Sequence, residues 1–237
     1  MSKFHLAAAA AAFLIPVGAA QAAEVNGGEL TLRFSAFTDD TDFNATALEG
    51  SLELGFTREL AVQLDVAQRF FGLIDDNTLT GTLHGIYHLS DLTSVGLFVG
   101  TESGAGSDLD YYGVEAGHEM MGWELEGYLG RGEDSGFDGI AAGLTGAYAV
   151  TPDFDVAGSV DHLDLDGGIS ATRLGLKGEY GFGNGLSVYG EVGNYHAKAG
   201  GASNSEPFVG IGASYKFGAE RGTTFQQRGL ARLIPGL

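Results

Sequence analysis

Two pairs of residues have the spacing that hydrolytic sites require. His88 and Ser90 are two residues apart, and Asp161 directly precedes His162. A histidine beside a serine can activate the hydroxyl as a nucleophile, and an acid can orient the imidazole. Such neighbours also arise by chance, and the sequence identifies no further acidic pair that would complete the second site. We therefore predict no catalytic residues and no enzymatic activity.

Acidic clusters at 39–42, 75–76 and 164–166 have the oxygen ligands that divalent cations prefer. Their spacing is not that of an EF-hand loop, and solvated loop charge explains them equally well. We predict no metal site and no cofactor.

A larger set of charged residues lies opposite the aliphatic residues of alternating segments. Charge on a lipid-facing wall costs about 2–4 kcal/mol near the bilayer midplane, so these side chains predict the inner face of a membrane barrel. Glycines of the same parity favour a water-filled pore. Ion pairs that plug the interior are the alternative. The predicted pore-lining residues are Glu49, Glu53, Asp65, Arg69, Glu115, Glu124, Glu126, Asp155, Asp161, Arg173, Lys177, Glu179 and Glu191.

The alternation repeats in segments about as long as a tilted transmembrane strand. It predicts an all-β fold, an up-and-down antiparallel transmembrane barrel of about twelve strands. A soluble β-sandwich is the alternative. The expected strands are 29–37, 45–56, 60–70, 78–87, 93–101, 109–118, 123–131, 138–149, 154–163, 169–182, 186–196 and 207–217.

The connections between these strands alternate in length. Tight turns at 57–59, 89–92, 119–122, 150–153 and 183–185 alternate with longer segments at 38–44, 71–77, 102–108, 132–137, 164–168 and 197–206. Short periplasmic turns opposite longer external loops are typical of outer-membrane barrels.

Aromatic residues gather at the same connections, which a sandwich does not explain. They predict a periplasmic girdle of Phe56, Tyr87, Trp123, Tyr148, Phe154, Tyr180, Phe182, Tyr215 and Phe217. A second group near the longer loops is expected in an outer girdle: Phe70, Tyr112, Phe137, Tyr195 and Phe208.

The last strand alternates from Val209 and Ile211 to Tyr215 and Phe217 without a break. It resembles the closing strand of Gram-negative outer-membrane β-barrels, and the whole of 29–217 resembles their small porin and porin-like families. The resemblance implies that Tyr215 and Phe217 form an assembly signal for the barrel insertion machinery.

The two ends of the chain differ from the barrel segments. Lys3, a short apolar run and Ala20-Gln21-Ala22 fit a cleavable leader, so 1–22 is predicted to be a signal peptide and 23–217 the barrel. Residues 218–237 form a basic periplasmic C-terminal tail in this prediction. Disorder, contact with the acidic lumen from below, and docking of a periplasmic partner remain open for it.

Composition limits the kinds of molecule that can bind this protein. The formal net charge of −19 excludes a nucleic-acid partner, and the absence of cysteine excludes disulfides. We expect a protein of the cell outer membrane, in contact with lipid and lipopolysaccharide, that passes ions and small hydrophilic solutes by passive diffusion. The excess of inward acids predicts weak cation selectivity. The alternative function is a structural or adhesive surface barrel with a closed lumen.

Overall fold

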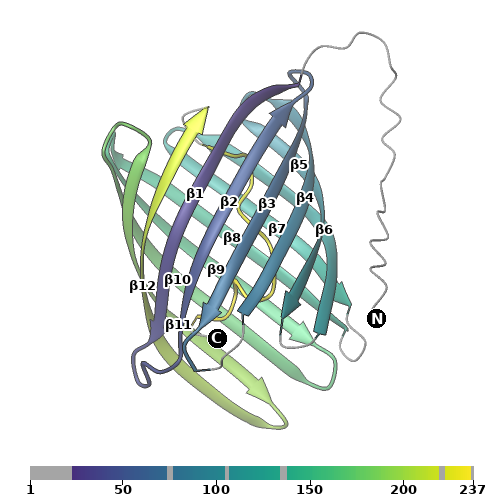
Figure 1. Cartoon of the computed structure of the whole chain (residues 1–237), viewed down its shortest axis with the longest axis vertical. Helices are drawn as coiled ribbons and strands as arrows, with labels where there is room; N and C mark the ends of the chain where they lie inside the picture. The colour runs from purple at the N-terminus through teal and green to yellow at the C-terminus, as the bar shows by residue number, and fades with distance from the viewer. Residues whose placement is uncertain (1–22, 74–76, 105–106, 134–137, 219–221, 236–237) are drawn as a thin grey trace.

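The computed structural model describes residues 23–73, 77–104, 107–133, 138–218 and 222–235, which form a closed antiparallel barrel (Figure 1). The predicted all-β, up-and-down fold is confirmed, while the predicted signal peptide lies outside the described residues. The strands are β1 (Glu24–Phe37), β2 (Asn44–Gly55), β3 (Leu60–Phe71), β4 (Asn77–Ser90), β5 (Thr93–Gly104), β6 (Ser107–Met120), β7 (Trp123–Glu133), β8 (Asp138–Thr151), β9 (Phe154–Leu165), β10 (Ile169–Gly181), β11 (Leu186–Ala199) and β12 (Ala202–Gly218).

The barrel closes between its first and last strands. Strands β1 and β12 pair antiparallel from Gly27 opposite Gly218 to Phe37 opposite Phe208. Every other strand pairs with its neighbours in sequence. A closed ladder leaves no strand edge, so the backbone hydrogen bonds are satisfied where no water is available.

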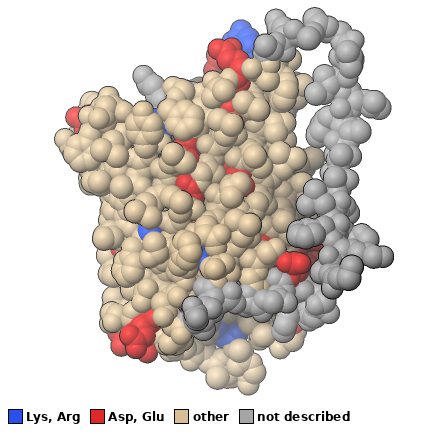
Figure 2. Space-filling view, in the orientation of Figure 1, with Lys and Arg blue, Asp and Glu red and all other residues tan. Residues whose placement is uncertain are grey.

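The outer surface of the barrel is apolar along its middle. Outward side chains such as Leu30, Leu32 and Ile211 are 55%, 55% and 64% exposed. The visible face is largely uncharged: the larger charged patches lie near the two ends, and only small ones show between the other side chains along the middle (Figure 2). Such a surface is unfavourable in water and suits contact with lipid acyl chains. Among the described residues, no helix is long and apolar enough to cross a membrane.

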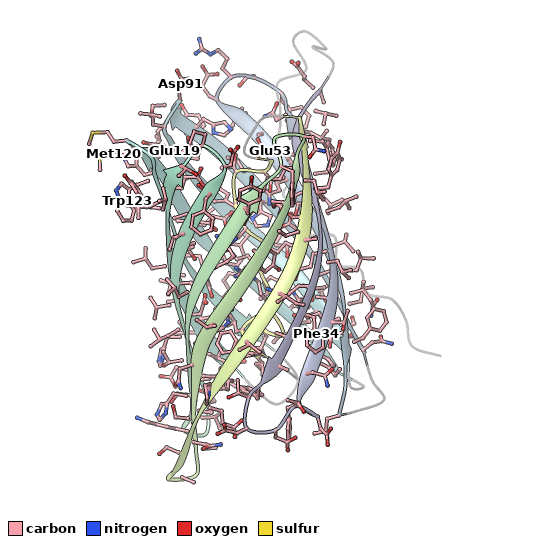
Figure 3. The ribbon with its side chains drawn as sticks, turned by 90° about the vertical axis from the view of Figure 1, so that its left-hand side faces the viewer. Phe34, Glu53, Asp91, Glu119, Met120 and Trp123 are labelled. Atoms are coloured by element: carbon pink, nitrogen blue, oxygen red, sulfur yellow. The ribbon has the colours of Figure 1, made fainter. Side chains whose placement is uncertain are left out.

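The two ends of the barrel carry different connections. We call the end with connections 56–59, 91–92, 121–122, 152–153 and 182–185 the turn end, and the opposite end the loop end. Outward aromatic rings pair at the turn end: Trp123 with Tyr148, Tyr180 with Phe182, and Tyr215 with Phe217, at centroid distances of 4.8, 5.3 and 6.4 Å. Figure 3 places Met120 and Trp123 on the outside near this end. These pairs are half-exposed, as an interfacial girdle requires.

Part of the expected outer girdle lies elsewhere. Phe70 and Tyr112 are outward and half-exposed, but Phe208 is 1% exposed and lies inside the barrel. Tyr195 also faces inward and packs near Leu233 of the tail. Their parity on the strands decides their direction, and their closeness to the loops does not. Phe137 lies outside the described residues.

The connections at the loop end are shorter than predicted because the strands continue into them. The expected loop 197–206 is a two-residue turn, with Ala199 paired to Ala202. Gly200 and Gly201 both have positive φ, 57° and 85°, the requirement of a type I′ hairpin turn.

The tail differs most from its expected position. Residues 222–235 lie inside the barrel, where the yellow trace runs from the end of β12 toward the loop end (Figure 1). Thr224 bonds Glu53 near the turn end, and Leu233 packs on Leu163 and Ala171 near the loop end. The expected periplasmic tail is therefore a luminal segment over its described length, because it is basic and apolar while the barrel wall is acidic.

The proposed assembly signal is testable on this fold. We expect Phe217→Ala to lower the amount of folded barrel in outer membranes, because the terminal aromatic is the feature that the insertion machinery would read. Phe182→Ala is the matched control, since Phe182 is an outward aromatic of the same end with 53% exposure. The measurement is the folded fraction by heat-dependent gel mobility. If both variants lose the same amount of folded barrel, the cause is the loss of an aromatic ring from the lipid interface and not the loss of a recognition signal.

Candidate functional site

The predicted pore-lining side chains lie on the inner face of the barrel. Nine of them line one cavity of the lumen: Glu49, Glu124, Glu126, Asp155, Asp161, Arg173, Lys177, Glu179 and Glu191. The others, Glu53, Asp65, Arg69 and Glu115, are at most 4% exposed. These buried residues contact the tail, or contact other charged residues of the wall.

The tail is fixed to the wall by Arg228, which is 3% exposed. Its Nε and Nη2 donate to Oε2 of Glu115 at 3.0 and 2.8 Å, and Nη2 also donates to Oε1 of Glu126 at 2.5 Å. The guanidinium lies 4.5 Å from the ring centroid of Tyr128. Buried charges are tolerated only when they are paired and hydrogen-bonded, so this contact sets the depth of the tail in the lumen.

Three residues before Arg228, on the side of the turn end, Phe225 makes a second contact with the wall. Gln63 donates from Nε2 to the Phe225 carbonyl at 2.7 Å and accepts from the Phe225 amide at 3.1 Å. The Phe225 ring stacks on His84 at 6.3 Å and packs on Ala61 and Ile86. The side-chain amide thus satisfies both backbone groups of Phe225, as a neighbouring strand would do.

His84 connects this contact to the Arg228 ion pair. Its Nδ1 lies 2.7 Å from Oε1 of Glu115, and its Nε2 lies 2.9 Å from Oδ2 of Asp65. An imidazole donates from both nitrogens only as the imidazolium, which two carboxylates favour. A continuous charged network therefore crosses β3, β4, β6 and the tail.

Inward glycines make room for these rings, whereas we expected them to leave space for water. A Cβ at Gly96 would lie 2.7 Å from the Phe225 ring, and one at Gly193 would lie 2.4 Å from the Phe208 ring. Both distances are too short for a side chain. Glycine therefore allows aromatic side chains to occupy the lumen at these two positions.

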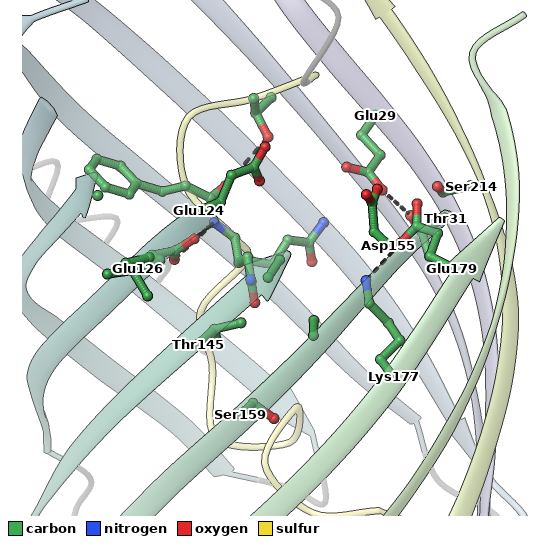
Figure 4. Close-up of a pocket in the computed structure, with 18 of the residues that line it drawn as sticks. Glu29, Thr31, Glu124, Glu126, Thr145, Asp155, Ser159, Lys177, Glu179 and Ser214 are labelled. Atoms are coloured by element: carbon green, nitrogen blue, oxygen red, sulfur yellow. Dashed lines mark hydrogen bonds and ion pairs between the residues drawn. The ribbon is translucent and has the colours of Figure 1, made fainter. Parts of the chain in front are cut away.

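Near the turn end, the lumen contains an acidic cavity of about 290 Å³ between the barrel wall and the tail (Figure 4). Carboxylates of Glu29, Glu124 and Asp155 line it, together with Glu179. Glu179 contacts Lys177 Nζ at 2.8 Å and Lys216 Nζ at 3.6 Å. The lysines are outnumbered by the acids, so the cavity attracts cations.

Midway along the lumen, arginines are concentrated. Arg33 and Arg69 share one oxygen, Oε1 of Glu49, at 2.8 Å each. Arg173 pairs with Glu191. Arg232 of the tail bonds Oε1 of Gln226 at 2.5 Å and has no ion pair with any described residue. We call Arg33, Arg69, Arg173 and Arg232 the arginine cluster.

Near the loop end, a second large cavity of about 300 Å³ has a mainly apolar wall. Leu109, Leu163 and Leu165 of the barrel and Leu230 and Leu233 of the tail line it. A third cavity, of about 10 Å³, lies at the arginine cluster, lined by Arg33, Arg69, Arg173 and Arg232. Arg232 lines all three, so the tail forms part of the wall of each of these cavities.

The two pairs with hydrolytic spacing do not form dyads. His88 Nδ1 contacts Oγ of Ser94 at 2.8 Å, and Ser90 Oγ accepts from the Leu92 amide. Asp161 is 5% exposed inside the barrel, whereas its neighbour His162 contacts Thr172 at an exposed position. Adjacent strand residues point to opposite faces, which separates this acid from this base.

Sequence reasoning placed Glu53, Glu115 and Glu126 on the inner face without predicting that they hold the tail, and it missed two further contacts. Glu102 accepts from the Ala231 amide at 3.0 Å, and Gln63 binds Phe225. The available signal was complementarity between a basic, apolar tail and an acidic inner face. It did not identify the residues that form each contact.

No protein family model and no curated protein matches the sequence. Solved structures share the fold. The NanC porin superposes with a TM-score of 0.63 at 14% identity, covering 79% of this chain and 100% of that one. The KdgM porin gives 0.60 at 11%, covering 80% and 99%. The COG4313 outer membrane channel from Pseudomonas putida F1 gives 0.57 at 14%, covering 85% and 100%. At these identities the similarity establishes the fold.

The anchoring role of Arg228 is testable by stability. We expect Arg228→Gln to destabilise the barrel by about 3–5 kcal/mol, because Glu115 would remain buried and lose a cation. Arg131→Gln is the control: Arg131 pairs with Glu133 and Asp138 at half-exposed positions, where a pair contributes about 0–1 kcal/mol. The measurement is the midpoint of denaturant unfolding in detergent. Equal midpoints for the two variants would contradict a structural role of the buried pair.

Proposed function

We propose that the protein is an outer-membrane channel for passive diffusion of ions and small hydrophilic solutes, narrowed by its own C-terminal tail. The observation that carries the proposal is the combination of an apolar outer wall with an interior that holds an acidic cavity of about 290 Å³ and a mainly apolar cavity of about 300 Å³. Such cavities can admit ions and small solutes. The separation of His88 from Ser90 and of Asp161 from His162 argues for transport over catalysis.

The proposed path follows the cavities between the tail and the barrel wall. It would run from the apolar cavity past the arginine cluster into the acidic cavity, with its narrowest point beside Arg232. Arg33, Arg173 and Glu191 line both the acidic and the small central cavity, which supports continuity between them. A narrow centre would limit passage to small solutes.

We propose weak cation selectivity for this path. The acids Glu29, Glu124 and Asp155 at the turn end lower the energy of cations in a confined passage. The arginine cluster opposes them locally, so the preference is expected to be moderate and to decrease as salt rises.

The partners proposed for the barrel follow from its surface. The apolar outer wall would contact outer-membrane lipid, and its loop end the lipopolysaccharide leaflet. The insertion machinery would read the strand that ends with Tyr215 and Phe217.

A second function, a structural or adhesive barrel with a closed lumen, is favoured by the tail itself. Phe225, Arg228 and Leu233 are at most 6% exposed and occupy much of the interior. If the lumen is closed beside Arg232, solutes cannot pass, and only the outer surface of the barrel is available to partners.

Conductance in planar bilayers separates these functions. We expect the full-length barrel to give small conductance steps and a chain ending at Gly218 to give larger ones, because the tail occupies part of the lumen. Phe225→Ala, which thins the tail but keeps the Arg228 anchor, serves if the truncated chain does not fold. Steps that appear only after truncation would support the closed barrel, and unchanged conductance in both variants would contradict a luminal role for the tail.

Selectivity is tested by neutralising the acidic cavity. We expect Glu124→Gln with Asp155→Asn to shift the reversal potential in a salt gradient toward zero, because both carboxylates line this cavity. Asp91→Asn, at a 90% exposed side chain of the same end, is the control and should change it little. An anion-selective wild-type channel would overturn the proposed selectivity.

A further inference from the structure

The apolar cavity near the loop end has the composition of a ligand site. Leu109, Leu163 and Leu165 form one side of it, and Leu230 and Leu233 of the tail form another. Its volume of about 300 Å³ lies at the lower end of the range of small-molecule pockets. A mainly apolar wall binds water poorly, so an apolar group that replaces water there is stabilised.

A cationic group stands where this cavity meets the arginine cluster. Arg232 lines the cavity, and among the described residues its one hydrogen bond is to Gln226, although a guanidinium carries five N–H donors. The other members of the cluster, Arg33, Arg69 and Arg173, each pair with a carboxylate. Arg232 is therefore available to an external anion.

Arg69 provides an independent indication of positive excess at the same place. It is 1% exposed, and its Nε is buried with no hydrogen-bond partner among the described residues. Arg69 and Arg232 both line the small cavity at the arginine cluster. Arg33 and Arg69 share one carboxylate oxygen of Glu49 as their ion-pair partner within the described part of the chain, so these two guanidiniums are only partly neutralised at short range. A carboxylate placed here would gain charge-assisted hydrogen bonds.

We propose that the apolar cavity and Arg232 together bind a small amphipathic carboxylate, an aryl or alkyl chain with a terminal carboxylate. The apolar body lies among Leu109, Leu163 and Leu165, and the carboxylate accepts hydrogen bonds from Arg232. The inference goes beyond the proposed channel function because it concerns a binding site in the lumen; only passage of the bound carboxylate would rest on that function. Because Arg232, Leu230 and Leu233 belong to the tail, the tail determines this specificity.

Calorimetric titration of the full-length barrel in lipid nanodiscs tests the site, with 4-phenylbutyrate as the probe. We expect saturable binding with one site per barrel above the partitioning that empty nanodiscs give. Acetate, which lacks the apolar body, and 4-phenylbutanol, which lacks the charge, should each bind at least about tenfold more weakly. Equal binding of the alcohol would overturn the role of the carboxylate, and equal binding of acetate that of the cavity.

Variants locate the site. Arg232→Gln should weaken 4-phenylbutyrate about tenfold and leave 4-phenylbutanol unchanged, because only the charged contact is lost. Leu163→Asn should weaken both ligands, with Leu109→Asn as the alternative if it does not fold. Arg58→Gln, whose side chain is 84% exposed at the turn end, is the control. Unchanged affinity in Arg232→Gln, or no saturable binding in the wild type, would overturn the proposal.

The same titration keeps the two proposals separate. Binding in nanodiscs does not require conduction, so binding without conductance steps would contradict the channel function and support the binding site. Conductance steps without saturable binding would support the channel function and contradict the binding site.

Discussion

The interior of this barrel depends on the buried pair between Arg228 and Glu115. The Glu115 side chain is fully buried and lies between His84 and Arg228, both of which contact it within 3 Å. Withdrawal of the tail would leave Glu115 with His84 alone and would expose the Phe225 site to water. Leaving one partner of a buried ion pair without the other is strongly destabilising, so the Arg228–Glu115 pair opposes withdrawal of the tail.

The tail that this pair holds in place divides the lumen into separate cavities. Against β3 and β4, the tail packs as a protein core does, with Phe225 on Ala61 and Ile86. Elsewhere cavities remain between the tail and the wall, one acidic and one mainly apolar. A barrel of this size is wider than its own side chains fill. The tail therefore supplies the missing interior, and what remains open depends on how much volume the tail occupies.

The sequence predicted the fold because lipid imposes a simple rule on a strand. A charged residue facing acyl chains is costly, so parity assigned the inner face and alternation assigned the strands. The same rule says nothing about depth or about partners across the lumen. It placed Glu115 inside and could not pair it with Arg228, which lies more than a hundred residues away. Inward glycines were ambiguous for the same reason, since Gly96 accommodates a ring that its own strand does not carry.

A luminal tail also couples properties that are separate in a barrel constricted by its wall. Arg228 holds the segment, and four residues further on Arg232 lines all three cavities. The Ala231 amide bonds Glu102 on the wall, so Glu102 fixes the backbone beside Arg232 as Glu115 and Glu126 fix Arg228. The proposed anchoring, pore width and ligand binding thus all depend on residues of one short segment. The surrounding strands hold that segment inside the barrel, where solutes would contact it.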